Sequence, residues 1–161
     1  MARTDRRIAL LLEVLDQAFG RAAWHGPNLA GSLRGLTWRE ALKRPRAGRH
    51  CIWELVLHTA YWKCIARKRL TRDPELEFPR APANFPVVPR KPTAALWRQD
   101  VVLLRKEHRL LRGVIARFPA ARLGRRAWHS HWTNVETIYG IASHDLYHAG
   151  QIQLIKALIH P

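Results

Sequence analysis

The sequence predicts an all-α protein built as a four-helix bundle with one long proline-rich crossover connection. Four stretches carry apolar residues at the three- and four-residue spacing of a helix face, and none alternates apolar and polar residues as a half-buried strand does. Six of the ten prolines fall within residues 71–92, where they exclude a helix and favour an extended chain. At about 3 Å per residue, this connection can cross the whole molecule. Bundles with such a crossover can hold a metal site in their core.

The expected helix boundaries follow from capping and breaking residues. Thr4 and Thr93 are expected to cap the first and third long helices, because a threonine side chain accepts a hydrogen bond from the free N–H groups at a helix start. Thr37 and Thr133 each precede a glutamate by three residues, which is the spacing of a capping box. We therefore expect long helices at about 5–19, 51–70, 93–118 and 133–159, and a short helix beginning at residue 37.

Length and composition indicate a single domain over residues 1–161. With 47% hydrophobic residues, the chain can bury a core and does not have the composition of a disordered protein. It has no apolar run near the roughly 18 residues of a membrane span, and its first residues lead into an amphipathic segment rather than a signal peptide. Two cysteines cannot form a disulfide framework, which favours a reducing compartment. We therefore expect a cytoplasmic protein with no membrane partner.

The chain is strongly basic. It has 28 lysines and arginines against 12 acids, a net charge of +16 and a pI near 11.4, and such a field attracts nucleic acids and acidic ligands. However, 22 of the 28 are arginines, a skew that coding bias also produces. No aromatic and basic residues repeat in the way that a nucleic-acid groove requires. Binding to nucleic acid or to an acidic partner is therefore an alternative that is not favoured.

Two histidines on the last expected helix have the spacing of metal ligands. His144 and His148 are four residues apart, so they lie one turn and about 40° from each other and point the same way. The same spacing serves zinc proteases. Ile141 and Ile155 share this helix face, so the pair is expected to be buried, where each unpaired polar group costs about 1–3 kcal/mol. The two imidazoles therefore need a metal ion or hydrogen-bond partners within the core.

A third histidine, His58, lies on the second long helix, on a face that the bundle is expected to bury. Lys63 and Arg67 are expected to point away from this face, toward water. If the helix neighbours the last one, the three imidazoles converge. Three neutral imidazoles suit Zn²⁺, Ni²⁺, Fe²⁺ or Co²⁺ and leave a coordination position open for water or substrate. Glu54, one turn before His58, is expected either to accept an imidazole N–H or to form a salt bridge with an arginine.

Two stretches carry a family resemblance: RHCIWELVLHTAYWKCIARKRL at residues 49–70 and ETIYGIASHDLYHAGQIQLI at residues 136–155. They resemble the DinB-like superfamily, the DinB/YfiT-like bacterial metal-binding four-helix bundles that are related to the bacillithiol and mycothiol transferases. The resemblance extends over nearly the whole chain and is most specific over these two helices. It implies that His58, His144 and His148 hold a divalent transition metal (zinc, nickel or iron). It also implies a homodimer.

The resemblance further implies a class of chemistry. The best-understood relatives use the metal to activate a low-molecular-weight thiol, so we expect a thiol S-transferase that acts on a small-molecule substrate. A hydrolase in which the metal activates water is the other enzymatic expectation. Tyr147 and Gln151, and also Tyr61, lie beside the histidines and are the candidates to orient or protonate the reactants. The alternatives are a non-catalytic, metal-binding stress-response protein and a basic binder of nucleic acid or acidic partners.

Overall fold

The computed structural model describes residues 5–80 and 84–159, and these ranges contain six α-helices, one 3₁₀ turn and no β-strand. The fold class expected from the sequence, an all-α bundle with a long proline-rich crossover, is confirmed. The expected helix positions agree with the observed ones to within about two residues, which is the usual uncertainty of helix ends. The helices are α1 (Arg6–Phe19), α2 (Leu29–Ser32), α3 (Trp38–Leu42), α4 (Ile52–Thr71), α5 (Ala94–Ala116) and α6 (Asn134–Ile159).

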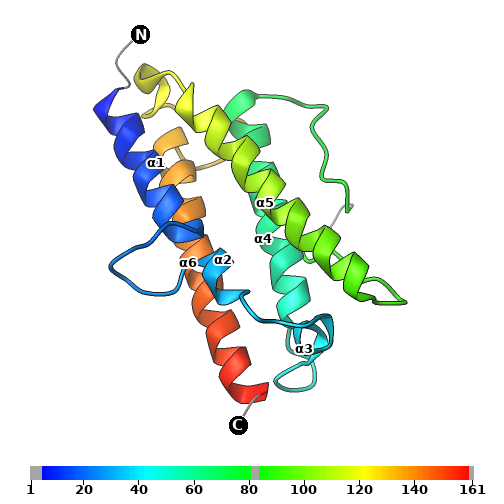
Figure 1. The fold of residues 1–161 in the computed structure, drawn as a ribbon. Coiled ribbons are helices and arrows are strands. Elements are labelled where there is room, and N and C mark those ends of the chain that lie inside the picture. Colours follow the sequence, from blue (N-terminus) through cyan, green and yellow to red (C-terminus); the bar gives the residue numbers. More distant parts are fainter. Residues whose placement is uncertain (1–4, 81–83, 160–161) are drawn as a thin grey trace.

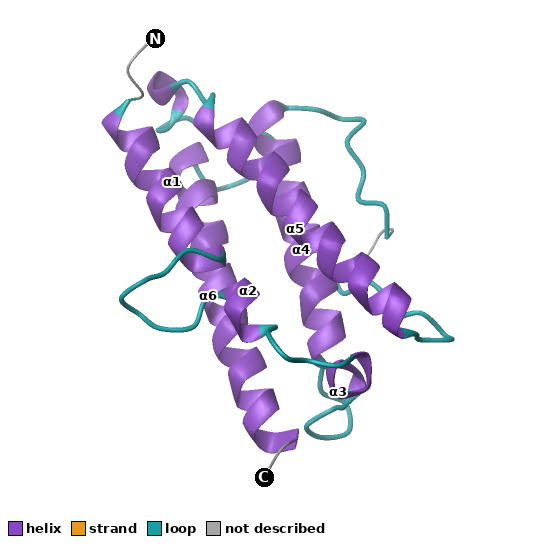
Figure 2. Cartoon of the chain, in the orientation of Figure 1, coloured by secondary structure: helices purple, strands orange, loops and turns teal. Residues whose placement is uncertain are grey.

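The four long helices form a bundle in which α4 packs against α5 and α6, and α1 packs against the same two helices. Figure 1 shows that α1 and α6 run in one direction, whereas α4 and α5 run in the other. Because α4 and α5 are parallel neighbours, the chain must return along the length of a helix of about 30 Å between them. The proline-rich connection does this, and it appears in Figure 2 as the long loop that joins the end of α4 to the start of α5.

Side-chain caps begin most of the helices. The Asp5 carboxylate accepts a hydrogen bond from the Arg7 backbone and caps α1, while Thr4 lies outside the described residues. Thr37 and Thr133 form the two expected capping boxes, and Thr93 caps α5. The short helix α2 was not expected. Asn28 caps it by accepting from the Gly31 N–H, and α2 then covers the part of α6 that the shorter α1 does not reach.

A layer of polar side chains divides the interior into two apolar cores. One core contains Trp53, Leu57, Trp97, Leu104 and Ile152, and the other contains Leu15, Leu70, Leu111, Ile115 and Ile138. On α5 and α6, polar residues lie between the part that enters one core and the part that enters the other, whereas on α4 they are interspersed among residues of both cores. We call these residues the polar layer: His58, Lys63, Arg67, Glu107, His108, His144, Asp145 and His148.

The prediction that Lys63 and Arg67 point to water is wrong. Lys63 is fully buried, and its Nζ donates to the equally buried carboxylate of Asp145. Arg67 is mostly buried and donates to Glu107 at 2.8 Å. The reason is the position of α4, which packs against α5 on one side and α6 on the other and has few positions that face solvent.

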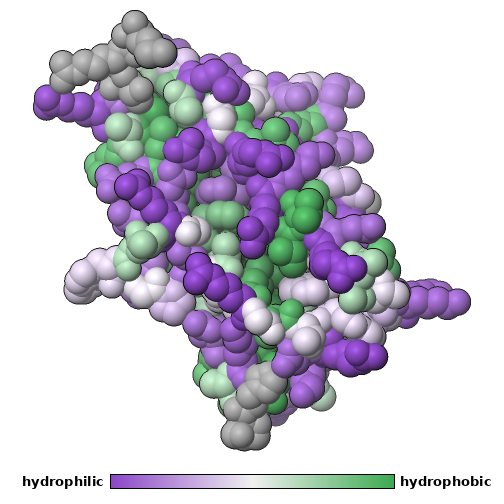
Figure 3. Space-filling view, viewed as in Figure 1, coloured by the Kyte–Doolittle hydropathy of each residue, from purple (hydrophilic) through white to green (hydrophobic). Residues whose placement is uncertain are grey.

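Hydrophilic residues predominate on the face of the molecule drawn in Figure 3, where hydrophobic residues gather mainly in the strip between α1 and α5. This distribution agrees with the excess of arginine and lysine, most of which lies before α6 in the sequence. None of the helices in the described part of the chain is both long and apolar enough to span a membrane.

Candidate metal centre

Three histidine side chains meet where α4 and α6 pack against each other in the middle of the bundle. The Nε2 atom of His144 lies 3.1 Å from Nε2 of His58 and 3.0 Å from Nε2 of His148. His144 and His148 reach the same point because they are one turn apart on α6, and His58 faces them because α4 is the neighbouring helix. The structure therefore brings together the three histidines that the sequence singled out.

The outer ring nitrogens of two of these histidines are held by carbonyl oxygens. His58 Nδ1 lies 2.7 Å from the backbone oxygen of Asn84, and His148 Nδ1 lies 2.7 Å from Oε1 of Gln151. A carbonyl oxygen only accepts, so each Nδ1 carries the proton and each Nε2 keeps a lone pair directed at the centre. Phe85 also stacks on His58, with ring centroids 4.0 Å apart. The crossover connection thus fixes the orientation of His58.

Burial keeps the three imidazoles neutral. Loss of solvent, together with the neighbouring His148, His58 and Lys63, lowers the pKa of His144 to about 3. Burial likewise lowers the pKa of His148 to about 4 and shifts the pKa of His58 downward. At neutral pH all three rings are therefore in the form that binds metal ions.

The arrangement fits a transition-metal ion. Metal–nitrogen bonds of 2.0–2.1 Å in tetrahedral geometry separate the ligand nitrogens by roughly 3.3 Å. The observed separations of 3.0 and 3.1 Å need only a small outward shift to match it. The buried Nδ1 of His144 has no hydrogen-bond partner among the described residues, so hydrogen bonding alone does not satisfy the cluster. The three histidines, whose ligand atoms all lie within 4.8 Å of one another, can hold one metal ion.

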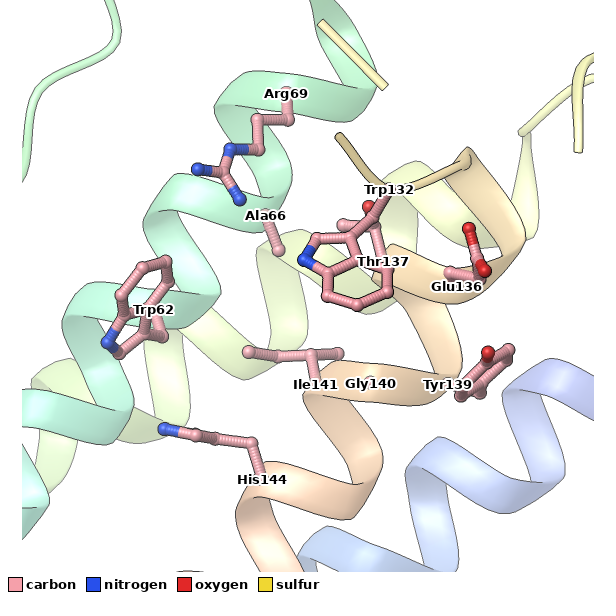
Figure 4. A pocket seen from close by; sticks show the side chains of 10 residues that line it. All are labelled: Trp62, Ala66, Arg69, Trp132, Glu136, Thr137, Tyr139, Gly140, Ile141 and His144. Atoms are coloured by element: carbon pink, nitrogen blue, oxygen red, sulfur yellow. The ribbon is translucent and has the colours of Figure 1, made fainter. Parts of the chain in front are cut away.

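Two cavities meet at His144. The first, which we call the Tyr147 cavity, has a volume of about 560 Å³ and borders all three histidines. The second, which we call the Trp62 cavity, has a volume of about 470 Å³ and borders His144 alone (Figure 4). The Tyr147 cavity is lined by Pro45, Arg49, His50, Leu55, His58, Phe85, His144, Tyr147, His148, Gln151, Leu154, Ile155 and Leu158. The Trp62 cavity is lined by Trp62, Ala66, Arg69, Trp132, Glu136, Thr137, Tyr139, Gly140, Ile141 and His144.

Comparison with models of protein families shows which family the chain belongs to. The model of the DinB superfamily matches residues 21–152, which is most of the sequence and includes all three histidines. The chain belongs to the DinB superfamily. No curated protein matches it, and no solved structure does. Membership and the histidine cluster together fit a metal-binding DinB-like protein.

The two candidate catalytic residues of this DinB superfamily protein occupy different positions. Gln151 accepts the hydrogen bond from His148 and thus positions a histidine. Tyr147 is 64% exposed and lines the Tyr147 cavity, with its ring centroid 5.0 Å from that of His148. Tyr61 lines neither cavity and is in ring contact with Trp62 and Phe78.

Glu54 forms the salt bridge that was one of its two expected roles. Its carboxylate pairs with Arg44 at 2.6 Å, contacts His50 Nδ1 at 3.2 Å and accepts the backbone N–H of Cys51. It therefore stabilises the start of α4, while the carbonyl of Asn84 takes the place beside His58.

Sequence reasoning missed two residues around the centre, Asn84 and Phe85, and assigned no role to Trp62, which lies one turn from His58 on α4. Trp62 donates from Nε1 to Oδ1 of Asn84 at 2.6 Å, and its ring centroid lies 6.4 Å from those of His58 and His144. Asn84 and Phe85 lie in the extended connection, where no helical spacing relates them to the histidines. An aromatic residue and an amide between prolines were the only signal in the sequence.

Proposed function

We propose that this protein is a metal-dependent enzyme of the thiol S-transferase or hydrolase kind. His58, His144 and His148 would hold a divalent zinc, nickel or iron ion. The observation that carries the proposal is the set of three neutral Nε2 atoms directed at one point beside two cavities. Among the described residues, no cysteine or carboxylate completes the cluster. Three protein ligands and an accessible cavity are typical of a catalytic rather than a structural site.

A divalent ion in this position would make a thiol or a water molecule more acidic and thus supply a nucleophile at neutral pH. Asn84 and Gln151 would keep the histidines in the required tautomer. The Tyr147 hydroxyl, at the open side of its cavity, can exchange a proton with a bound reactant.

The protein's own cysteines do not suit the role of nucleophile. Cys51 and Cys64 are both buried, and burial raises the pKa of Cys51 and raises that of Cys64 to about 11. Both side chains are therefore protonated thiols at neutral pH. This supports a thiol that enters from solution as a small molecule.

An activity screen tests the proposal. Protein loaded with zinc, nickel or ferrous iron is incubated with low-molecular-weight thiols plus chromogenic electrophiles, and separately with chromogenic esters and amides. We expect turnover in at least one set. We also expect Tyr147→Phe to lower kcat by about 100-fold or more with unchanged metal content, because a positioned proton donor or acceptor contributes at least that much. Tyr61→Phe is the matched control and should keep full activity, since Tyr61 lines neither cavity.

Other results would favour the alternatives. A metal-loaded protein that turns over none of these substrates would contradict the enzymatic proposal and favour a non-catalytic, metal-binding stress-response protein. Tight binding to duplex DNA at physiological salt, weakening steeply as salt rises, would favour the basic surface as the functional feature.

We also propose that two copies of the chain pair through the outer face of α6. In a chain with a net charge of +16, none of the three charged side chains of α6 is exposed, so α6 itself adds no exposed like charge to a contact between copies. The face instead presents the exposed residues Tyr139, Tyr147, Leu154 and Leu158. Because the last three also line the Tyr147 cavity, the partner copy would border that cavity.

Sedimentation analysis tests the pairing. We expect a dimer that Leu158→Lys converts to monomer, because this change places two cations opposite each other in a symmetric contact. Leu10→Lys, at a similarly exposed leucine on α1, should stay dimeric. A monomeric unaltered protein would contradict the proposal.

A further inference from the structure

The Trp62 cavity has the size and lining of a small-molecule site. It lies between α4 and α6, and its volume of about 470 Å³ is within the usual range for ligand pockets. Figure 4 shows Trp62, Ala66 and Arg69 following one another along α4, with Ile141 and His144 on α6 facing them. Trp132, from the loop before α6, extends over the space between the two helices. The walls thus offer aromatic and aliphatic surface for a flat apolar molecule.

One charged side chain of this cavity, Arg69, has no ion-pair or hydrogen-bond partner among the described residues. Its guanidinium carbon lies 5.8 Å from the Trp62 ring centroid. Glu136, the acid of the same cavity, accepts at Oε2 from both the backbone N–H and the hydroxyl of Thr133. Figure 4 shows Glu136 on the far side of Trp132 from Arg69. The group of the cavity that can bind an anion is therefore Arg69, which lies beside an aromatic ring and apart from Glu136 (Figure 4).

Arg69 and His144 lie at opposite ends of the Trp62 cavity (Figure 4). The Arg69 guanidinium carbon lies 5.8 Å from the Trp62 ring centroid, which in turn lies 6.4 Å from the ring centroid of His144. The charged group and the histidine ring are therefore at most about 12 Å apart. A molecule with its anionic group on Arg69 and an apolar body that extends past Trp62 would bring its other end to His144. The Tyr147 cavity reaches the same histidine from the other side, so two reactants can approach the centre separately.

We infer that the Trp62 cavity binds an elongated, apolar or aromatic carboxylate, with the carboxylate on Arg69 and the apolar body between Trp62 and Trp132. Such a molecule would be the substrate that receives the nucleophile, and this assignment rests on the proposed function. Binding of the carboxylate does not depend on the metal. The protein could therefore bind metal but no carboxylate, or a carboxylate but no metal, and the two proposals are tested separately.

Isothermal titration calorimetry with 2-naphthoate and its neutral isostere 2-naphthamide tests the inference, at about 0.15 M salt so that the general basic field is screened. We expect 2-naphthoate to bind with a Kd below about 1 mM and at least about tenfold more tightly than the amide, since a charged hydrogen bond to arginine is worth that factor. Arg69→Gln should reduce the preference to about twofold or less. Arg109→Gln removes the same charge from an exposed site outside the cavities and should preserve the preference.

A second variant fills the cavity without disturbing the fold. A Cβ built on Gly140 meets no heavy atom within 4 Å, so Gly140→Leu extends into free space and also favours the helix. It should abolish binding of both naphthyl compounds. The inference is wrong if 2-naphthoate does not bind the unaltered protein, or if Arg69→Gln keeps the tenfold preference. It is equally wrong if a naphthylmethyl trimethylammonium ion binds more tightly than the carboxylate, because the cavity would then be an aromatic cage for cations.

Discussion

Asp145→Asn should lower the free energy of unfolding by about 3–5 kcal/mol, because it leaves the ammonium group of Lys63 buried without a counter-charge. Both side chains are fully inaccessible to solvent, and Lys63 Nζ donates to Asp145 Oδ2. Among the described residues, no other carboxylate pairs with Lys63; the remaining charge contact is the face of Phe19, at 5.1 Å from Nζ. Urea unfolding followed by circular dichroism measures the change.

Two further variants separate this effect from a general loss of packing. Asp16→Asn makes the same substitution at the partly exposed pair with Arg112 and should cost less than about 1 kcal/mol. Lys63→Met combined with Asp145→Asn removes both buried charges and should be more stable than Asp145→Asn alone. If Asp145→Asn and Asp16→Asn have equal unfolding midpoints, the buried pair of Lys63 and Asp145 does not contribute the stability predicted for it.

Gln151→Leu should weaken metal binding by about 10–100-fold, the usual effect of removing a hydrogen bond to a ligating histidine. Gln151 Oε1 lies 2.7 Å from Nδ1 of His148 and sets which nitrogen of that ring carries the proton. Leucine has a similar length but offers no acceptor, so His148 can then turn or adopt the other tautomer. Competition with a chromophoric chelator measures the affinity for zinc or nickel.

Gln153→Leu is the matched control for this change. Gln153 lies two residues further along α6, is half-buried and lines neither cavity, so its replacement should leave the affinity within about twofold. If Gln151→Leu binds metal as tightly as Gln153→Leu, the hydrogen bond to His148 does not hold the ligand in place.

The sequence was sufficient for the bundle because capping boxes and prolines act locally. Three helices begin at the capping threonines predicted from the sequence, Thr37, Thr93 and Thr133. The prolines of residues 71–92 prevent the crossover from forming a helix. Helical spacing also brought His144 and His148 to one face. That they and His58 bind metal remains a prediction.

Contacts between a helix and a loop, or between helices distant in the sequence, could not be predicted, because no helical spacing relates the residues involved. The partner of His58 is a backbone carbonyl of the crossover, which any residue type at position 84 would supply. The burial of Lys63 depends on α4 lying between two neighbours, and a helical wheel shows only one apolar face. The Trp62 cavity requires the loop before α6 to bring Trp132 over two helices that are distant in sequence.

Metal content tests the central claim most directly. Plasma mass spectrometry is applied to the purified protein and to a His144→Ala/His148→Ala variant, with circular dichroism to establish that both are folded. The account predicts about one equivalent of a transition metal in the unaltered protein and none in the variant. No metal in either protein, even after addition of zinc or nickel, would contradict it and leave the three histidines as a hydrogen-bonded part of the polar layer.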